Sequence, residues 1–117
     1  MGFGFEKLEV YHKAVDFVSD IYSLTKKFPK DEMFGLTGQL RRAAVSISNN
    51  IAEGSGSSSL PDFRKFLDFS VKSAFETVNM IYFAKERDYL KENEMSELYE
   101  QAEKIIRKIR AFKNSLK

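Results

Sequence analysis

Cysteine and tryptophan are absent from the sequence, which contains only two prolines and one histidine. The lack of cysteine excludes disulfide bonds, thiolate zinc sites and cysteine nucleophiles, and it is typical of a reducing cytoplasm. No stretch approaches the ~20 consecutive apolar residues that a membrane-spanning helix needs, and the N-terminal residues lack the pattern of a signal peptide. We therefore expect a cytoplasmic protein that does not contact a membrane.

Acidic and basic residues are nearly balanced, with 19 Lys and Arg against 17 Asp and Glu, which gives a formal net charge of +2. A charge of this size permits RNA binding but does not argue for it. The 117 residues fit one domain, which we predict to span residues 1–117. A chain of this length can bury one hydrophobic core without disulfides or metal ions.

Apolar residues recur at helical spacing along nearly the whole chain, and no alternating strand pattern occurs. Pro29 and Pro61 fall between the periodic segments, Gly54 is suited to end a helix, and Ser59 is suited to begin one. Short connections place consecutive helices antiparallel. The sequence therefore predicts an all-α, antiparallel up-down-up-down four-helix bundle, with helices over Glu6–Phe28, Leu36–Gly54, Leu60–Tyr89 and Glu92–Leu116.

The third predicted helix has more apolar surface than three neighbouring helices can cover. Its core stripe includes Leu67, Ala74 and Ile81, but aromatic residues extend the apolar surface most of the way round the helix. The second predicted helix has no charge from Ala43 to Ala52 and presents small or neutral residues on its outer side. Both features favour self-association. We predict an oligomer interface at Val45, Ser48, Ala52, Phe66, Phe69, Met80 and Phe83.

Several motifs resemble a bacterial four-helix-bundle family, first noticed as proteins encoded in intervening sequences of large-subunit ribosomal RNA genes. The resemblance runs nearly end to end and rests on Phe34-Gly35-Leu36, Gln39-Leu40-Arg41-Arg42-Ala43-Ala44, Asn50-Ile51-Ala52-Glu53-Gly54, Asp62-Phe63 and Phe66-Leu67. It implies the bundle fold and a ring-like homo-oligomer, most often a pentamer.

The resemblance predicts the fold of the protein but indicates no biochemical mechanism. The family is similar in fold to the accessory proteins of diversity-generating retroelements, which assist a reverse transcriptase and contact nucleic acid. Members often carry arginine after the glycine-rich turn, where this chain has Ser57. If that arginine binds phosphate, this contact is missing here.

Arg41 and Arg42 are the most distinctive polar residues, because they lie in an otherwise neutral helix. One interpretation is a clamp for phosphate or RNA, since a guanidinium group binds phosphate bidentately. The interpretation that we favour is a structural ion pair with Glu53 or Glu76, within or between subunits.

The second half of the last predicted helix is rich in basic residues, which form a candidate RNA-binding surface: Lys104, Arg107, Lys108, Arg110 and Lys113. The charges spread around the helix, and favourable interaction with the helix dipole explains them equally well.

Motifs for catalysis and metal binding are weak. Glu9 and His12 have the Glu-x-x-His spacing of di-iron bundles, but a single histidine cannot complete such a site within one chain. Asp16 and Asp20 are spaced one helical turn apart, as carboxylates on a solvated face often are. We expect no enzymatic activity, cofactor, metal or small-molecule substrate. The first hypothesis is a homo-oligomeric scaffold or adaptor, and the alternative is an accessory protein that binds RNA or an RNA-handling protein.

Overall fold

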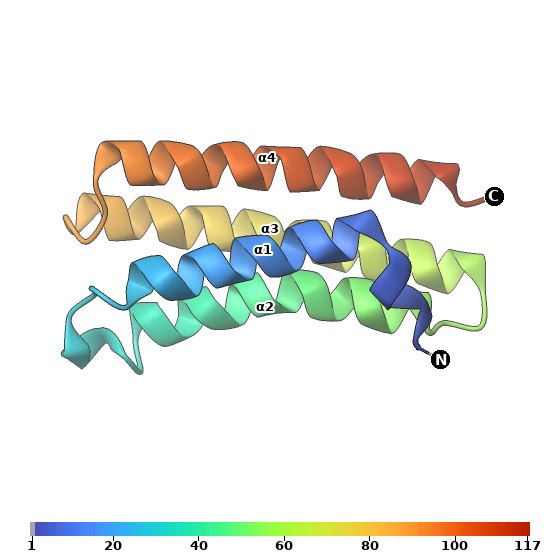
Figure 1. Ribbon diagram of the computed structural model, residues 1–117, viewed down its shortest axis with the longest axis horizontal. Helices are drawn as coiled ribbons and strands as arrows, with labels where there is room; N and C mark the ends of the chain where they lie inside the picture. Colours follow the sequence, from blue (N-terminus) through green and yellow to red (C-terminus); the bar gives the residue numbers. More distant parts are fainter. Residues whose placement is uncertain (1) are drawn as a thin grey trace.

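Amphipathic segments form the helices where the apolar periodicity predicts them. The computed structural model describes residues 2–117, and within this range the chain forms four α-helices and no strand (Figure 1). The α-helices are α1 (Glu9–Thr25), α2 (Leu36–Ser55), α3 (Leu60–Glu86) and α4 (Glu92–Ser115), and the short 3-10 helices are η1 (Gly4–Lys7) and η2 (Lys30–Glu32). The all-helical bundle predicted from the sequence is confirmed.

Each α-helix packs against two others, in the order α1, α2, α3, α4 and back to α1, and α2 with α3 makes the most extensive contact. Residue pairs across α1 and α4 run in opposite directions: Glu9 pairs with Lys108, and Lys27 pairs with Glu94. The core is formed by the predicted stripes, including Phe17, which is completely buried. The whole molecule is a rod of 44 × 24 × 22 Å.

The first helix is shorter at both ends than the predicted span from Glu6 to Phe28. Leu8 has an extended backbone that separates η1 from α1, and its side chain packs against the core. His12 Nε2 donates a hydrogen bond to Glu6 O (2.6 Å) and holds η1 against α1. At the start of α1, the tertiary packing of Leu8 therefore overrides the local preference for helix. At the other end, α1 stops at Thr25.

Gly54 does not end the second helix as predicted. Helix α2 continues to Ser55, and Gly56 is its C-terminal cap. Gly54 is buried where α2 meets α3, and a Cβ atom there would lie 2.9 Å from Phe63 Cδ1 and 2.9 Å from Phe66 Cβ. The glycine is therefore required by close helix packing. The predicted start of α3 is confirmed, because Ser59 Oγ accepts a hydrogen bond from Asp62 N (3.2 Å).

Helix α3 ends at Glu86, three residues before the predicted boundary. Tyr89 N donates to Ala84 O (2.8 Å) and Asp88 N donates to Lys85 O (2.9 Å), which is the hydrogen-bond pattern of a Schellman motif. Asp88 has a φ of 64°, in the left-handed region that aspartate tolerates better than most residues. This turn directs the chain into α4. Across residues 2–117, no helix combines the length and apolar character needed to cross a membrane.

Candidate functional site

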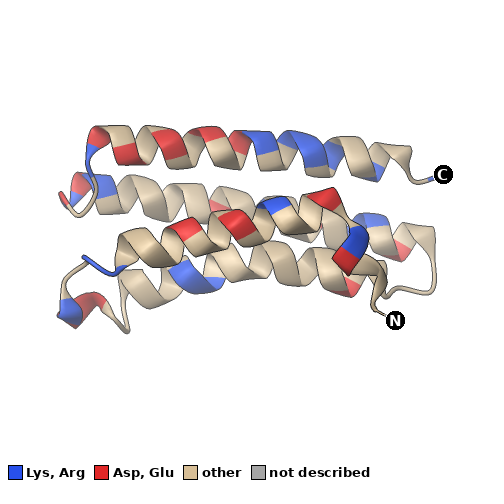
Figure 2. Ribbon diagram, viewed as in Figure 1, with Lys and Arg blue, Asp and Glu red and all other residues tan. Residues whose placement is uncertain are grey.

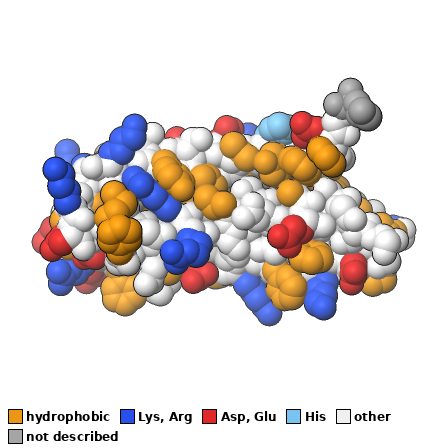
Figure 3. All heavy atoms as spheres, turned by 90° about the horizontal axis from the view of Figure 1, so that it is seen from below, with side chains coloured by type: hydrophobic (Ala, Val, Ile, Leu, Met, Phe, Trp, Pro, Cys, Tyr) orange, Lys and Arg blue, Asp and Glu red, His pale blue; other side chains and the backbone are white. Residues whose placement is uncertain are grey.

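The predicted oligomer interface lies mainly on the outer side of α2 and α3. Phe69 and Phe83 keep 38% and 55% of their surface exposed, and Phe66 and Met80 are half-buried. Figure 3 views the molecule from the α2 side: hydrophobic side chains form separate groups along the lower edge, and the row near the upper edge lies beside the single histidine, which belongs to α1. We call these four α3 residues, with Val45 and Ala52 of α2, the α2–α3 face.

Neighbouring side chains hold the Phe69 ring in position on this face. Its ring packs edge-to-face on Phe66, with 5.9 Å between the ring centroids. The ammonium groups of Lys65 and Lys72 lie 6.0 and 5.9 Å from the Phe69 centroid, which is the range of cation–π contact. An aromatic group held in position but still partly exposed, with a charged rim, is typical of an interface anchor.

The α2 part of the predicted interface is less uniform. Val45 and Ala52 are half-buried and face outward, as the neutral helix surface predicts. Ser48 is buried in its own chain, where its Oγ donates to Val45 O (2.8 Å). Ser48 therefore offers little surface to a second subunit. Ser46 and Ser73 share a hydrogen bond of 2.9 Å that joins α2 to α3, so small polar residues here also hold the protomer together.

Arg41 has a structural partner that differs from the carboxylates considered from the sequence. Its Nε donates to Thr25 Oγ1 (2.9 Å), and its guanidinium lies 4.6 Å from the centroid of the Tyr22 ring. Thr25 is buried at the end of α1 and also donates to Ile21 O (2.7 Å). Arg41 therefore ties α2 to the last turn of α1.

Arg42 lies on the opposite side of α2 and is exposed. With Glu76 and Met80 it lines a shallow groove of ≈ 260 Å³ between α2 and α3. Within residues 2–117, neither arginine forms an ion pair with Glu53 or Glu76. The structure thus gives Arg42 a position at a groove and leaves its proposed pairing between subunits as a prediction.

Charge is divided along α4, with acidic residues in its first half and basic residues in its second half (Figure 2). Three of the five predicted basic residues have carboxylate partners: Lys108 with Glu9 (2.7 Å), Lys113 with Asp68 (2.8 Å) and Lys104 with Glu100 (3.9 Å). The Lys108 hydrogen bond lowers the pKa of the Glu9 carboxyl. Lys108 therefore joins α4 to α1 and Lys113 joins α4 to α3, whereas Lys104 pairs within α4. Arg107 and Arg110 carry the more available charge.

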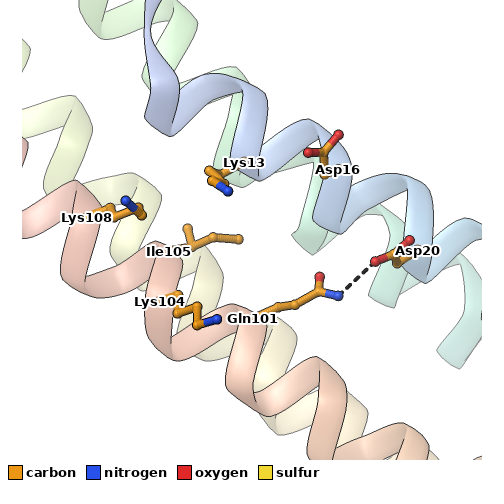
Figure 4. A pocket seen from close by; sticks show the side chains of 7 residues that line it. All are labelled: Lys13, Asp16, Asp20, Gln101, Lys104, Ile105 and Lys108. Atoms are coloured by element: carbon orange, nitrogen blue, oxygen red, sulfur yellow. Dashed lines mark hydrogen bonds between the residues drawn. The ribbon is translucent and has the colours of Figure 1, made fainter.

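A polar groove of ≈ 260 Å³ separates α1 from α4 and is lined by Lys13, Asp16, Asp20, Gln101, Lys104, Ile105 and Lys108 (Figure 4). Gln101 Nε2 donates to Asp20 Oδ2 (2.8 Å) across the groove. The Asp16 carboxylate points away from Ile105, so the two aspartates do not converge on one point (Figure 4). The arrangement joins two helices and offers no paired acid and base.

Glu9 and His12 do not converge on a metal position either. Glu9 accepts a hydrogen bond from Lys108 Nζ, and His12 donates a hydrogen bond to the backbone oxygen of Glu6. In the part of the chain that the structure describes, no group of three or more His, Cys, Asp or Glu residues could hold a metal ion. Ser57 lies in the connection between α2 and α3, where its backbone N donates to Gly54 O (3.0 Å).

One exposed residue was missed when the interface was predicted from the sequence. Phe34, in the connection between α1 and α2, is 99% exposed. The signal for it was an aromatic residue outside the apolar periodicity, beside Gly35. Phe75 and Tyr82 are 54% and 50% exposed. They are among the aromatic residues that extend the apolar surface of the third predicted helix, although the predicted interface does not include them.

The comparisons with known proteins agree with this architecture. A solved structure from Bacteroides thetaiotaomicron VPI-5482, described as a protein of unknown function from the S23 ribosomal protein family, superimposes with a TM-score of 0.81. The two sequences are 23% identical, and the match covers 88% of this chain and 96% of the other. At this identity the likeness shows the fold. No curated protein matches. The family model described as "23S rRNA-intervening sequence protein" matches residues 6–111, and the chain therefore belongs to this family, as its motifs predict.

Proposed function

We propose that the protein acts as a non-enzymatic homo-oligomeric scaffold or adaptor, assembled through the α2–α3 face. The observation that carries the proposal is the exposure of Phe69 and Phe83 on the outer side of α3. Both project from a rigid helix, so their rings lose little conformational freedom when they are covered. Large aromatic side chains that a protomer leaves in water are typical anchors of an interface.

The neutral surface of α2 supports the same proposal. From Ala43 to Ala52 this helix carries no charged side chain, although its outer side is not covered by the protomer. A second subunit can approach such a surface without burying an unpaired charge. In the proposed assembly each protomer is an up-down-up-down bundle, which the opposite-running residue pairs support, and five protomers form a ring, as the family resemblance implies.

The oligomeric mass tests the proposal directly. Light scattering on a sizing column should give a mass several times that of the 13.5 kDa protomer at micromolar concentration. Phe69→Asp and Phe83→Asp should each shift the assembly toward the monomer while the helical content by circular dichroism is unchanged. Phe3→Asp is the matched control, because Phe3 is 74% exposed and lies before η1, away from α3. A monomeric parent protein would refute the proposal.

Binding of RNA, with the oligomer as an accessory protein, is the second candidate function. It is favoured by Arg107 and Arg110, which are exposed and form no ion pair within residues 2–117. Binding through these groups should weaken steeply as the salt concentration rises, because each neutralised phosphate releases counterions. Replacing both arginines by glutamine should reduce that salt dependence. Absence of binding at low salt would remove this candidate.

A further inference from the structure

The connection between α1 and α2 presents an aromatic side chain that is held in solvent. Phe34 is 99% exposed and its neighbour Met33 is 45% exposed. The connection is nevertheless well fixed: Tyr89 Oη donates to Glu32 Oε2 (2.8 Å), and Leu36 N donates to Glu32 Oε1 (3.2 Å). These bonds lower the pKa of the Glu32 carboxyl and keep it charged. A fixed loop that displays a phenyl ring has the form of an interface anchor.

A groove that suits such a ring lies elsewhere on the same chain. Between α3 and α4 a mostly apolar depression of ≈ 270 Å³ has a floor of Val78, Ala102 and Ile106. Phe75 and Tyr99 also line it, and Phe75 is 54% exposed. The floor and walls offer an aromatic ring apolar contact on several sides, which a flat surface would not provide.

Charge complements shape at this groove. Glu103, Arg107 and Arg110 line it and give it one net positive charge, and the Arg110 guanidinium lies 5.9 Å from the centroid of the Phe75 ring. The loop 30–34 carries Lys30, Asp31 and Glu32, which give it one net negative charge. Within residues 2–117, Asp31, Arg107 and Arg110 form no ion pair with any side chain. The net charges of the loop and the groove are therefore opposite.

The loop cannot reach the groove of its own chain. Glu32 fixes it to Tyr89, in the turn between α3 and α4 at one end of the rod. Val78 lies eight residues before the end of α3 and Ile106 fourteen residues after the start of α4. At a rise of about 1.5 Å per residue, they are about 12 and 21 Å from that end along their helices. An anchor and a groove that match but cannot meet within one chain require a second copy.

We propose that the loop 30–34 of one copy docks on the α3–α4 groove of a second copy, with the Phe34 ring on the apolar floor and Asp31 facing Arg107 and Arg110. The inference rests on the proposed self-association and adds to it a second contact, separate from the α2–α3 face. Because the two partner surfaces differ, the contact is heterologous, and repetition of such a contact closes into a ring when the rotation between copies permits it.

The first test removes the anchor without disturbing the protomer. Phe34→Ala should weaken self-association, measured by sedimentation equilibrium, by about tenfold or more in the dissociation constant. Its helical content and unfolding midpoint as a monomer should not change, because the ring is almost fully in water. Phe3→Ala is the control, at a residue that is also highly exposed. If the parent associates and Phe34→Ala associates equally well, the docking is wrong while self-association stands; a monomeric parent refutes both.

The second test identifies the partner surface and uses the absence of cysteine. A Met33→Cys variant, which keeps the Phe34 ring, and a Glu103→Cys variant, at the edge of the groove, are mixed under reducing conditions and then oxidised. The proposal expects disulfide-linked dimers that contain one chain of each kind. Ser58→Cys, in the connection between α2 and α3, replaces Glu103→Cys in the control mixture. Cross-linking of Met33→Cys to Glu103→Cys that does not exceed the control would overturn the assignment of the groove.

Discussion

At the scale of single residues, Gly54 shows that a position within one helix can require glycine because a neighbouring helix packs closely against it. Glycine in a helix interior is less favourable than alanine by about 1 kcal/mol. Gly54 lies within α2, and α3 approaches it so closely that a Cβ atom would meet Phe66 Cβ at 2.9 Å. Phe66 Cβ is attached directly to the backbone and cannot turn aside, so the close approach outweighs helix propensity.

We expect Gly54→Ala to lower the free energy of unfolding by about 1–2 kcal/mol, because the strain of overpacking exceeds the gain in helix propensity. Gly56→Ala provides the control. A Cβ atom at Gly56 would lie 3.5 Å from Glu53 O, an ordinary contact. Its effect should stay within about 0.5 kcal/mol. Urea denaturation of the parent protein and of the two variants measures these free energies of unfolding. Equal stability of the two variants would contradict the packing argument.

Residues with a local cause were predictable, and residues with a tertiary cause were not. Ser59 caps α3 through the next turn of its own helix, so its sequence neighbours define its role. The partner of Arg41 is Thr25, sixteen positions away on another helix, and nothing in the spacing of charges indicates it. The burial of Ser48 likewise depends on how the helices pack and not on its sequence neighbours. The candidate site was therefore only partly predictable.

At the scale of helices, ion pairs fasten the ends of α4 to its neighbours. Glu94, in the first turn of α4, accepts hydrogen bonds from Lys27 Nζ and from Lys91 N. The Lys27 hydrogen bond and then the backbone bond lower the pKa of Glu94 below its ordinary value of 4.5. Because the folded state holds this carboxyl more weakly protonated than the unfolded chain does, its contribution is present above pH 4.5 and is lost as the pH falls through the lowered pKa.

Glu94→Gln should therefore reduce the stability at pH 7 by roughly 0.5 kcal/mol, the size of an exposed ion pair, and should have less effect at pH 3. The measurement is the free energy of unfolding by denaturant at both values of pH. Glu97→Gln, an exposed residue of the same helix, is the control. A loss of stability from Glu94→Gln that is the same at both pH values would contradict the role of its charge.

The helices themselves were predictable because each has its own apolar stripe. In α4, apolar residues recur at helical spacing from Leu98 to Ile109, and these residues are buried. The ends were less predictable. Leu8 interrupts the first helix because its side chain packs on the core, and Asp88 takes a left-handed conformation that a glycine would have signalled more clearly. The local apolar pattern determines which segments form helices, and tertiary contacts determine the residues at which the helices begin and end.

At the scale of the whole molecule, aromatic groups remain exposed on two different sides of α3. Phe69 packs on Phe66, which lies against Gly54 of α2, and Phe75 lines the groove between α3 and α4. An isologous dimer would use the same patch on both subunits and leave the other patch in water. A heterologous assembly covers one patch of each copy with a different patch of the next. In the proposed assembly, the distribution of these aromatic side chains therefore favours a closed cyclic oligomer over a simple dimer.

If association stabilises the folded protomer, the midpoint of thermal unfolding should rise with protein concentration, because binding between native chains adds to their stability by mass action. Differential scanning calorimetry at low and at high micromolar concentration measures this. Phe83→Asp should remove the concentration dependence, and Phe3→Asp should keep it. A midpoint that does not change with concentration in the parent would indicate that folded copies do not associate in this range.

The division of charge along α4 has a consequence for diffusion. Glu92 and Glu94 stand at one end of the helix, and the basic residues that follow Lys104 stand toward the other. A net charge of only +2 gives the protein little attraction for ions of either sign at long range. The electrostatic field near α4 is nevertheless that of a dipole, negative at the first half of the helix and positive at the second half. Lys85 and Lys27 pair with Glu92 and Glu94 at the acidic end, whereas Arg107 and Arg110 form no ion pair within residues 2–117. A charged molecule close to α4 therefore experiences a stronger field at the basic half of the helix than at the acidic half.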